Sequence, residues 1–284
     1  MFLKLWKHDW RASSRLLGLL SLGAIGVALL GGFALWGANG VVSNAPSDEM
    51  VALTSPGLYL LFSFCCMALV GYVVAVQIIQ IAHFYKSRFT DQGYLTFTLP
   101  IKTKYIYLSS AANMLLWLVL SLLVALGCFT LLFAIGMGDT IRQLQSDEMF
   151  LYFWDTLRFG FTDLQENLRD MPGHKLNVTL TILSIMLSPI YTVATILGCV
   201  TLGSVWAKRH KILAAIGVYY LLSMAISIAT GVAEGVFFIV MMNEENLYAY
   251  YNLQQTFVLL LNCGITVGSY LLSVRLMKKK LNLN

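Results

Sequence analysis

Residues 16–38 read LLGLLSLGAIGVALLGGFALWGA, an apolar stretch without a charged side chain. A helix of roughly 20 residues is enough to cross the hydrocarbon core of a bilayer. The apolar region of a cleavable signal peptide is shorter, at roughly 7 to 15 residues. The stretch from Leu16 to Ala38 is therefore predicted to be a first transmembrane span that remains in the mature protein.

Five more apolar stretches follow, and the composition agrees with a membrane protein. The 284 residues are 58% hydrophobic and 12% charged, whereas soluble domains carry about 25% charged residues. The mean hydropathy is +0.73. We expect an all-α polytopic membrane protein that forms a single transmembrane domain, residues 1–284, with six transmembrane helices. The other five spans are predicted at residues 57–82, 105–136, 176–207, 212–232 and 256–277.

The basic residues are confined almost entirely to alternate hydrophilic pieces. Most of the 19 Lys and Arg lie in residues 1–15, 83–104, 208–211 and 275–280. The first and fifth intervening loops carry acids and no base, and the third is net acidic. Short cationic loops stay cytoplasmic, so both termini are predicted to be cytoplasmic. Positive residues at membrane flanks favour anionic lipid headgroups as partners, and we expect no nucleic-acid binding.

The N-terminal residues 1–15 are predicted to form an interfacial helix on the cytoplasmic leaflet. Phe2, Trp6 and Trp10 recur at helical spacing, and basic residues surround the opposite side. This pattern is typical of helices that lie in the membrane interface. A simple basic topology anchor explains it equally well.

The third loop, residues 137–175, is predicted to contain an amphipathic external helix. Ser146 is a plausible N-cap followed by two acids, and Pro172 with Gly173 would end the helix. The apolar residues between them recur every three or four positions. Covering the bundle or the outer leaflet is the simpler role, and contact with a transported molecule or a partner is the other. The predicted surface consists of Phe150, Trp154, Leu157, Phe161, Leu164 and Leu168.

Two features within the apolar stretches carry further expectations. The fifth is apolar up to Met242, and one straight helix of that length would project beyond a roughly 30 Å core. We therefore expect a break near Gly231 or Gly235, followed by a short helical or re-entrant element. Pro189 should kink the fourth span.

Few polar side chains lie within the predicted spans. The main candidates for an intramembrane functional site are Gln77, Asn113, Glu234 and Asn262. Such groups usually face the protein interior or a water-filled path. An interfacial position is favoured for Glu234 over a buried functional carboxylate. Hydrogen bonding between helices is the default use of the two asparagines.

The sequence lacks the common signatures of catalysis. It contains no G-x-x-x-x-G-K-[ST] phosphate loop, no H-E-x-x-H spacing and no G-x-S-x-G, which are the marks of ATP binding, zinc proteases and many hydrolases. The five cysteines all lie in apolar runs without ligand spacing. We expect no enzymatic activity, and no cofactor or metal on this chain.

The loop of residues 83–104 carries the strongest functional signal. It reads HFYKSRFTDQGYLTFTLPIKTK, and Pro100 would end a short helix that begins near Asp91. The stretch resembles the first cytoplasmic loop of ABC-2-type permeases, which are membrane subunits of bacterial ABC transporters. The GYLTFTLP variant looks like the form common in Gram-positive bacteria. The matching residues are Asp91, Gly93, Tyr94, Leu95, Thr96, Thr98, Leu99, Pro100, Ile101 and Lys104.

The resemblance implies a coupling helix, from Gly93 to Pro100, that seats in a groove of a separate ATP-binding subunit. ATP and Mg would then be held by that partner, and a second permease subunit, identical or related, would complete the transporter. The implied location is the bacterial plasma membrane. The long third loop departs from the family, in which spans three and four are closely connected. An ordinary structured loop is the alternative reading of residues 83–104.

Three function classes follow. The first is an ABC-2-like permease that exports an amphipathic peptide, drug-like compound, ion or lipid by ATP-driven alternating access. The second is an ATPase-independent membrane sensor or interaction protein that uses the external helix. The third, a secondary carrier, ranks last because the sequence has no inverted repeat and no mid-span carboxylate.

Overall fold

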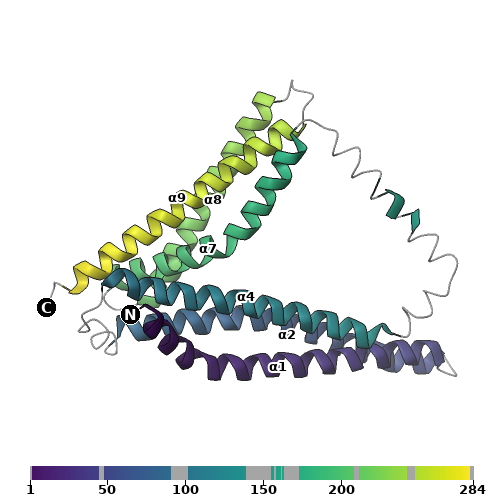
Figure 1. Ribbon diagram of the computed structural model, residues 1–284. Coiled ribbons are helices and arrows are strands. Elements are labelled where there is room, and N and C mark those ends of the chain that lie inside the picture. The colour runs from purple at the N-terminus through teal and green to yellow at the C-terminus, as the bar shows by residue number, and fades with distance from the viewer. Residues whose placement is uncertain are drawn as a thin grey trace. The chain divides into compact units, whose positions relative to one another are not determined.

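The computed structural model describes residues 2–44, 48–90, 102–138, 155–156, 158–160, 162, 173–207, 211–241 and 247–281. Six long helices account for most of them (Figure 1). The described residues contain no strand. The helices are α1 (Phe2–Asn44), α2 (Asp48–Phe89), α4 (Thr103–Gly136), α7 (His174–Trp206), α8 (Lys211–Met241) and α9 (Leu247–Leu281).

Each of the six helices is long and apolar enough to cross a membrane. This confirms the prediction of an all-helical, multi-pass membrane protein. Each predicted span lies within one helix, apart from the last residue of the fourth, Ala207. Helices α1, α2 and α9 extend well past the apolar stretches that predicted them, so their hydrophilic flanks are also helical.

The chain divides into two compact units. One consists of residues 10–80 and 116–161, and holds the greater part of α1, α2 and α4. The other consists of residues 1–9, 81–115 and 162–284, and holds α7, α8 and α9 together with the remaining ends of α1, α2 and α4. We refer to them below as the α1–α2–α4 unit and the α7–α8–α9 unit.

The α1–α2–α4 unit has a close-packed core. Leu17, Leu69 and Leu132, one from each helix, are fully buried, and the rings of Trp10 and Trp117 stack with centroids 4.7 Å apart. A Cβ atom at Gly31 would lie 2.8 Å from Cβ of Cys65 and 2.9 Å from Leu132. Small residues at such crossings let membrane helices approach closely, because van der Waals packing drives their association.

The α7–α8–α9 unit uses the same device. A Cβ atom at Gly203 of α7 would clash with the backbone of Ala215 in α8. The buried hydroxyls of Thr201 in α7 and Ser273 in α9 are 2.9 Å apart. Hydrogen bonds of this kind between membrane helices add to packing. The close approach at Gly203 holds α7 against α8, and the Thr201–Ser273 contact holds it against α9.

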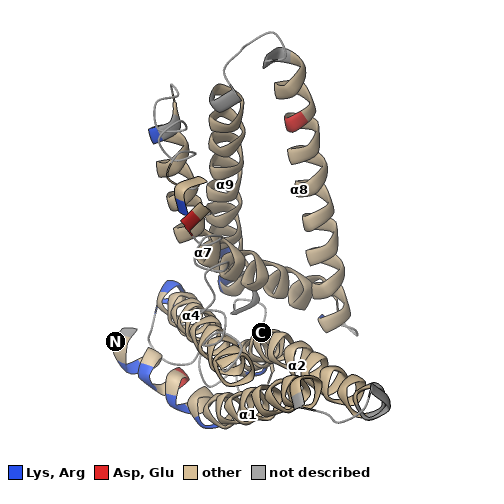
Figure 2. Ribbon diagram, turned by 90° about the vertical axis from the view of Figure 1, so that its right-hand side faces the viewer, with Lys and Arg blue, Asp and Glu red and all other residues tan. Residues whose placement is uncertain are grey.

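Two expectations about helix continuity have different outcomes. The expected break near Gly231 is wrong, since α8 continues to Met241 through both Gly231 and Gly235. A glycine lowers helix propensity only modestly, and a helix is the conformation that satisfies its own backbone in lipid. Pro189 lies inside α7, and α7 bends along its length (Figures 1 and 2), as expected for a proline within a helix.

The N-terminal segment is helical, as predicted, but it is not a separate helix. Residues 2–15 continue directly into the first span, so α1 is a single helix of 43 residues. No proline or glycine lies at the boundary between the two parts, since the first glycine of α1 is Gly18. The helical backbone therefore continues across the boundary. Lys and Arg gather on the N-terminal part of α1 (Figure 2).

Candidate functional site

A buried ion pair joins two helix ends in the α7–α8–α9 unit. The guanidinium Nη2 of Arg88, in the last turn of α2, donates to Oδ2 of Asp9 in α1 at 2.7 Å. Only 3% of the Arg88 side chain and 7% of the Asp9 side chain are exposed. Both charges are therefore largely removed from solvent. Loss of either partner would leave the other charge buried and uncompensated, which costs folding free energy.

Two serines from the first turns of α4 complete the arrangement. Ser109 Oγ donates to the same Oδ2 atom of Asp9 at 3.1 Å. Arg88 donates to Ser110 Oγ from Nε at 3.3 Å and from Nη2 at 3.2 Å. Because one guanidinium reaches both neighbours, three helices meet at a single hydrogen-bonded group. We call these four residues, Asp9, Arg88, Ser109 and Ser110, the basal joint.

Aromatic packing orders the end of α2 beside the basal joint. Phe89 lies edge-on to Phe84, with centroids 5.7 Å apart, and its ring is nearly parallel to that of Tyr85. Phe84 and Phe89 are both buried. Apolar side chains around a buried ion pair lower the local dielectric, which strengthens its hydrogen bonds.

The basal joint lies next to the loop that resembles a coupling loop. The last described residue of the preceding segment is Thr90, two positions after Arg88, and description resumes at Lys102, just before α4. The joint therefore ties together the two helix ends from which residues 91–101 depart. It also adds α1 as a third support.

The predicted coupling residues themselves lie outside the described residues, as does the predicted external surface. The first group is Asp91, Gly93, Tyr94, Leu95, Thr96, Thr98, Leu99 and Pro100, and the second is Phe150, Trp154, Leu157, Phe161, Leu164 and Leu168. Between the members of the second group, residues 155–156, 158–160 and 162 are described and helical.

The four predicted intramembrane polar residues are all described. Asn113 in α4 is buried, at 2% exposure, whereas Gln77 in α2 and Asn262 in α9 are half-buried. The amide oxygen and nitrogen of Gln77 are both buried without a hydrogen-bond partner among the described residues. Gln254 Nε2 of α9 donates to Oε1 of the half-buried Glu234 at 2.8 Å. Glu234 thus links α8 to α9.

Sequence reasoning missed the basal joint. Asp9 is an acid within a strongly basic N-terminal piece, and Arg88 lies among the cations of the next basic piece. This isolated acid was the available sequence signal, because a single carboxylate within a basic segment indicates a specific ion pair. Its partner could not be chosen from sequence, since the two residues are 79 positions apart.

A comparison of the chain with protein-family models, curated proteins and solved structures finds no match.

Proposed function

We propose that this chain is the membrane-spanning permease subunit of a bacterial ABC transporter of the ABC-2 type. The single observation that carries the proposal is the position of the basal joint, which braces both ends of the loop that resembles a coupling loop. Six helices that could cross a membrane support it. The proposed cargo is an amphipathic peptide, drug-like compound, ion or lipid, and the direction is outward.

The proposed mechanism is movement of helices as rigid units. An ATP-binding subunit would press on residues 91–101 when it closes on ATP and Mg. A loop whose two ends were free would absorb that push by bending. Here Arg88 of α2 and Ser110 of α4 are hydrogen-bonded to each other. Asp9 of α1 binds Arg88 and also accepts from Ser109 of α4, which ties both helices to α1. The push would therefore reach three helices together, and packed helices change position as units.

The proposal includes two kinds of protein partner. One is the ATP-binding subunit, and the other is a second permease subunit, either a copy of this chain or a related chain. Both termini and the loop of residues 83–104 would face the cytoplasm of a bacterial plasma membrane.

Co-purification with the ATPase tests the proposal directly. The chain is co-expressed with its candidate ATP-binding subunit, and the amount of ATPase recovered on the tagged permease is measured. Replacing Tyr94 and Leu95 with Asp should abolish recovery, because charged groups would be placed in an apolar seat. Tyr94→Phe with Leu95→Met is the matched control that keeps apolar character. Undiminished recovery with the Asp variant would refute the coupling role.

The second candidate is an ATPase-independent membrane sensor or interaction protein. One observation favours it: Phe159 lies in the helical part of the third loop and is 74% exposed. Exposed aromatic residues are common anchors of protein interfaces. Deleting residues 150–168 should abolish capture of an external partner on this reading, while leaving recovery of the ATPase on the permease unchanged.

A further inference from the structure

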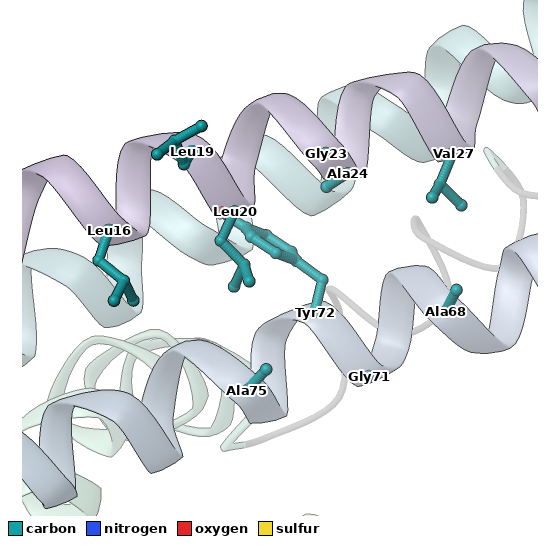
Figure 3. Close-up of a pocket in the computed structure, with 10 residues that line it drawn as sticks. All are labelled: Leu16, Leu19, Leu20, Gly23, Ala24, Val27, Ala68, Gly71, Tyr72 and Ala75. Carbon is teal, nitrogen blue, oxygen red and sulfur yellow. The ribbon is translucent and has the colours of Figure 1, made fainter.

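The α1–α2–α4 unit contains a groove between α1 and α2. It has a volume of about 580 Å³. Leu16, Leu20 and Val27 line it from α1, and α2 supplies Tyr72 and small residues (Figure 3). Leu16 is 53% exposed, so the groove is accessible at that end.

The surface of the groove is apolar and has room. In Figure 3 the Tyr72 ring reaches across to α1 beside Leu20. The Tyr72 hydroxyl is satisfied by Ser21, at 2.8 Å, and so presents no unmet polar group to an occupant. A Cβ atom added at Gly23 or Gly71 would meet nothing within 4 Å. Open space beside the two glycines can take an apolar chain.

The length of the groove corresponds to one leaflet. Its α1 lining runs from Leu16 to Val27, a rise of about 16 Å at about 1.5 Å per residue. Half of a bilayer core is about 15 Å thick. The groove is therefore about as long as an acyl chain that crosses one leaflet along α1.

Charge at one end of the groove completes the match. Arg11 and Arg15 precede the lining residue Leu19 by eight and four positions, which places all three on one face of α1. Both arginines are exposed. The nearby acid Asp9 is already paired with Arg88. The cationic end is thus available to a phosphate just where the apolar lining begins.

We propose that this groove binds one anionic phospholipid from the leaflet that holds the N-terminus, with an acyl chain between α1 and α2 and its phosphate at Arg11 and Arg15. Arginine suits this role because its planar fork binds phosphate oxygens in a bidentate manner. The site is separate from the basal joint and does not depend on transport activity.

Native mass spectrometry of the purified chain tests the proposal. The protein is extracted from nanodiscs of phosphatidylglycerol, phosphatidylcholine or an equal mixture, and the phospholipids retained per chain are counted. The wild type should retain one phosphatidylglycerol. Replacing Arg11 and Arg15 with Gln should reduce the preference for phosphatidylglycerol by about fivefold for each arginine. Equal retention of both lipids by the wild type would overturn the proposal.

A variant that fills the groove provides the second test of the proposal. Gly23→Leu places an apolar side chain in the groove and should reduce lipid retention, because it occupies space that the acyl chain would fill and association within a bilayer depends on packing. Gly26→Leu is the matched control, since Gly26 also has nothing within 4 Å but does not line the groove. Equal lipid retention by the two variants would overturn the proposal. So would an unchanged lipid count with loss of a dimer in Gly23→Leu, because the occupant would then be a second copy of this chain.

Discussion

Removal of one charge from the basal joint should destabilise the protein more than removal of both. In Asp9→Leu, the guanidinium of Arg88 stays buried, with 3% of its side chain exposed, and loses its carboxylate partner. Unit charges about 4 Å apart attract by about 4 kcal/mol at an effective dielectric constant of about 20. Breaking a buried ion pair in this way typically costs about 3–5 kcal/mol. We expect a loss of that size in the free energy of unfolding.

The double variant Asp9→Leu with Arg88→Met should recover most of that loss. Apolar replacement of both members removes the buried charge along with the pair, and such replacements are often neutral or stabilising. Ser110→Ala should cost about 1 kcal/mol, because the hydroxyl is one of two acceptors for the guanidinium. Lys7→Leu, at an exposed position of the same helix, is the control for adding an apolar residue to α1.

The assay is equilibrium unfolding of the purified chain in mixed micelles, with increasing sodium dodecyl sulfate and helix content followed by circular dichroism. The reasoning fails if Asp9→Leu unfolds within about 1 kcal/mol of the wild type, a fraction of the expected cost. It also fails if the double variant is as unstable as Asp9→Leu, since the loss would then come from packing and not from an uncompensated charge.

Two further predictions concern packing of the α7–α8–α9 unit. Gly203→Ala should destabilise the unit by about 1–3 kcal/mol because its methyl group would clash with the α8 backbone, whereas Gly217→Ala, which has open space around it, should be neutral or slightly stabilising in the same unfolding assay. Ser273→Ala removes a buried hydroxyl contact to α7 and should cost about 0.6 kcal/mol, the average for hydrogen bonds between membrane helices; a loss above about 2 kcal/mol would show a larger role for this contact.

The spans could be predicted from sequence because each depends on a local property. Uninterrupted apolar stretches and their cationic flanks identify helices without any knowledge of neighbours. The ends were less predictable. α2 begins at Asp48 and continues through Pro56, although the predicted second span began only after that proline. The boundary of an apolar stretch marks where lipid exposure ends, and helical hydrogen bonding continues beyond it.

The basal joint could not be predicted because it depends on helix packing. Asp9 and Arg88 are each visible as charges in the sequence, and Arg88 belongs to the cations that predicted the topology. Which acid pairs with which base depends on how each helix is rotated about its axis and on how deep it lies in the membrane. A count of charged residues contains neither piece of information. The amphipathic pattern of the third loop predicted one external helix. Of that segment the structure describes residues 155–156, 158–160 and 162, which are helical, and the external helix as a whole stays a prediction.

Because α8 is so little buried within the protein, the thickness of the membrane acts on it directly. None of its apolar window is buried inside the structure, so its surroundings are set by lipid more than by protein. A straight helix of 31 residues is about 46 Å long, which exceeds a bilayer core of about 30 Å. Tilt is one way in which a membrane accommodates that mismatch. Thicker or thinner bilayers would therefore shift the preferred inclination of α8.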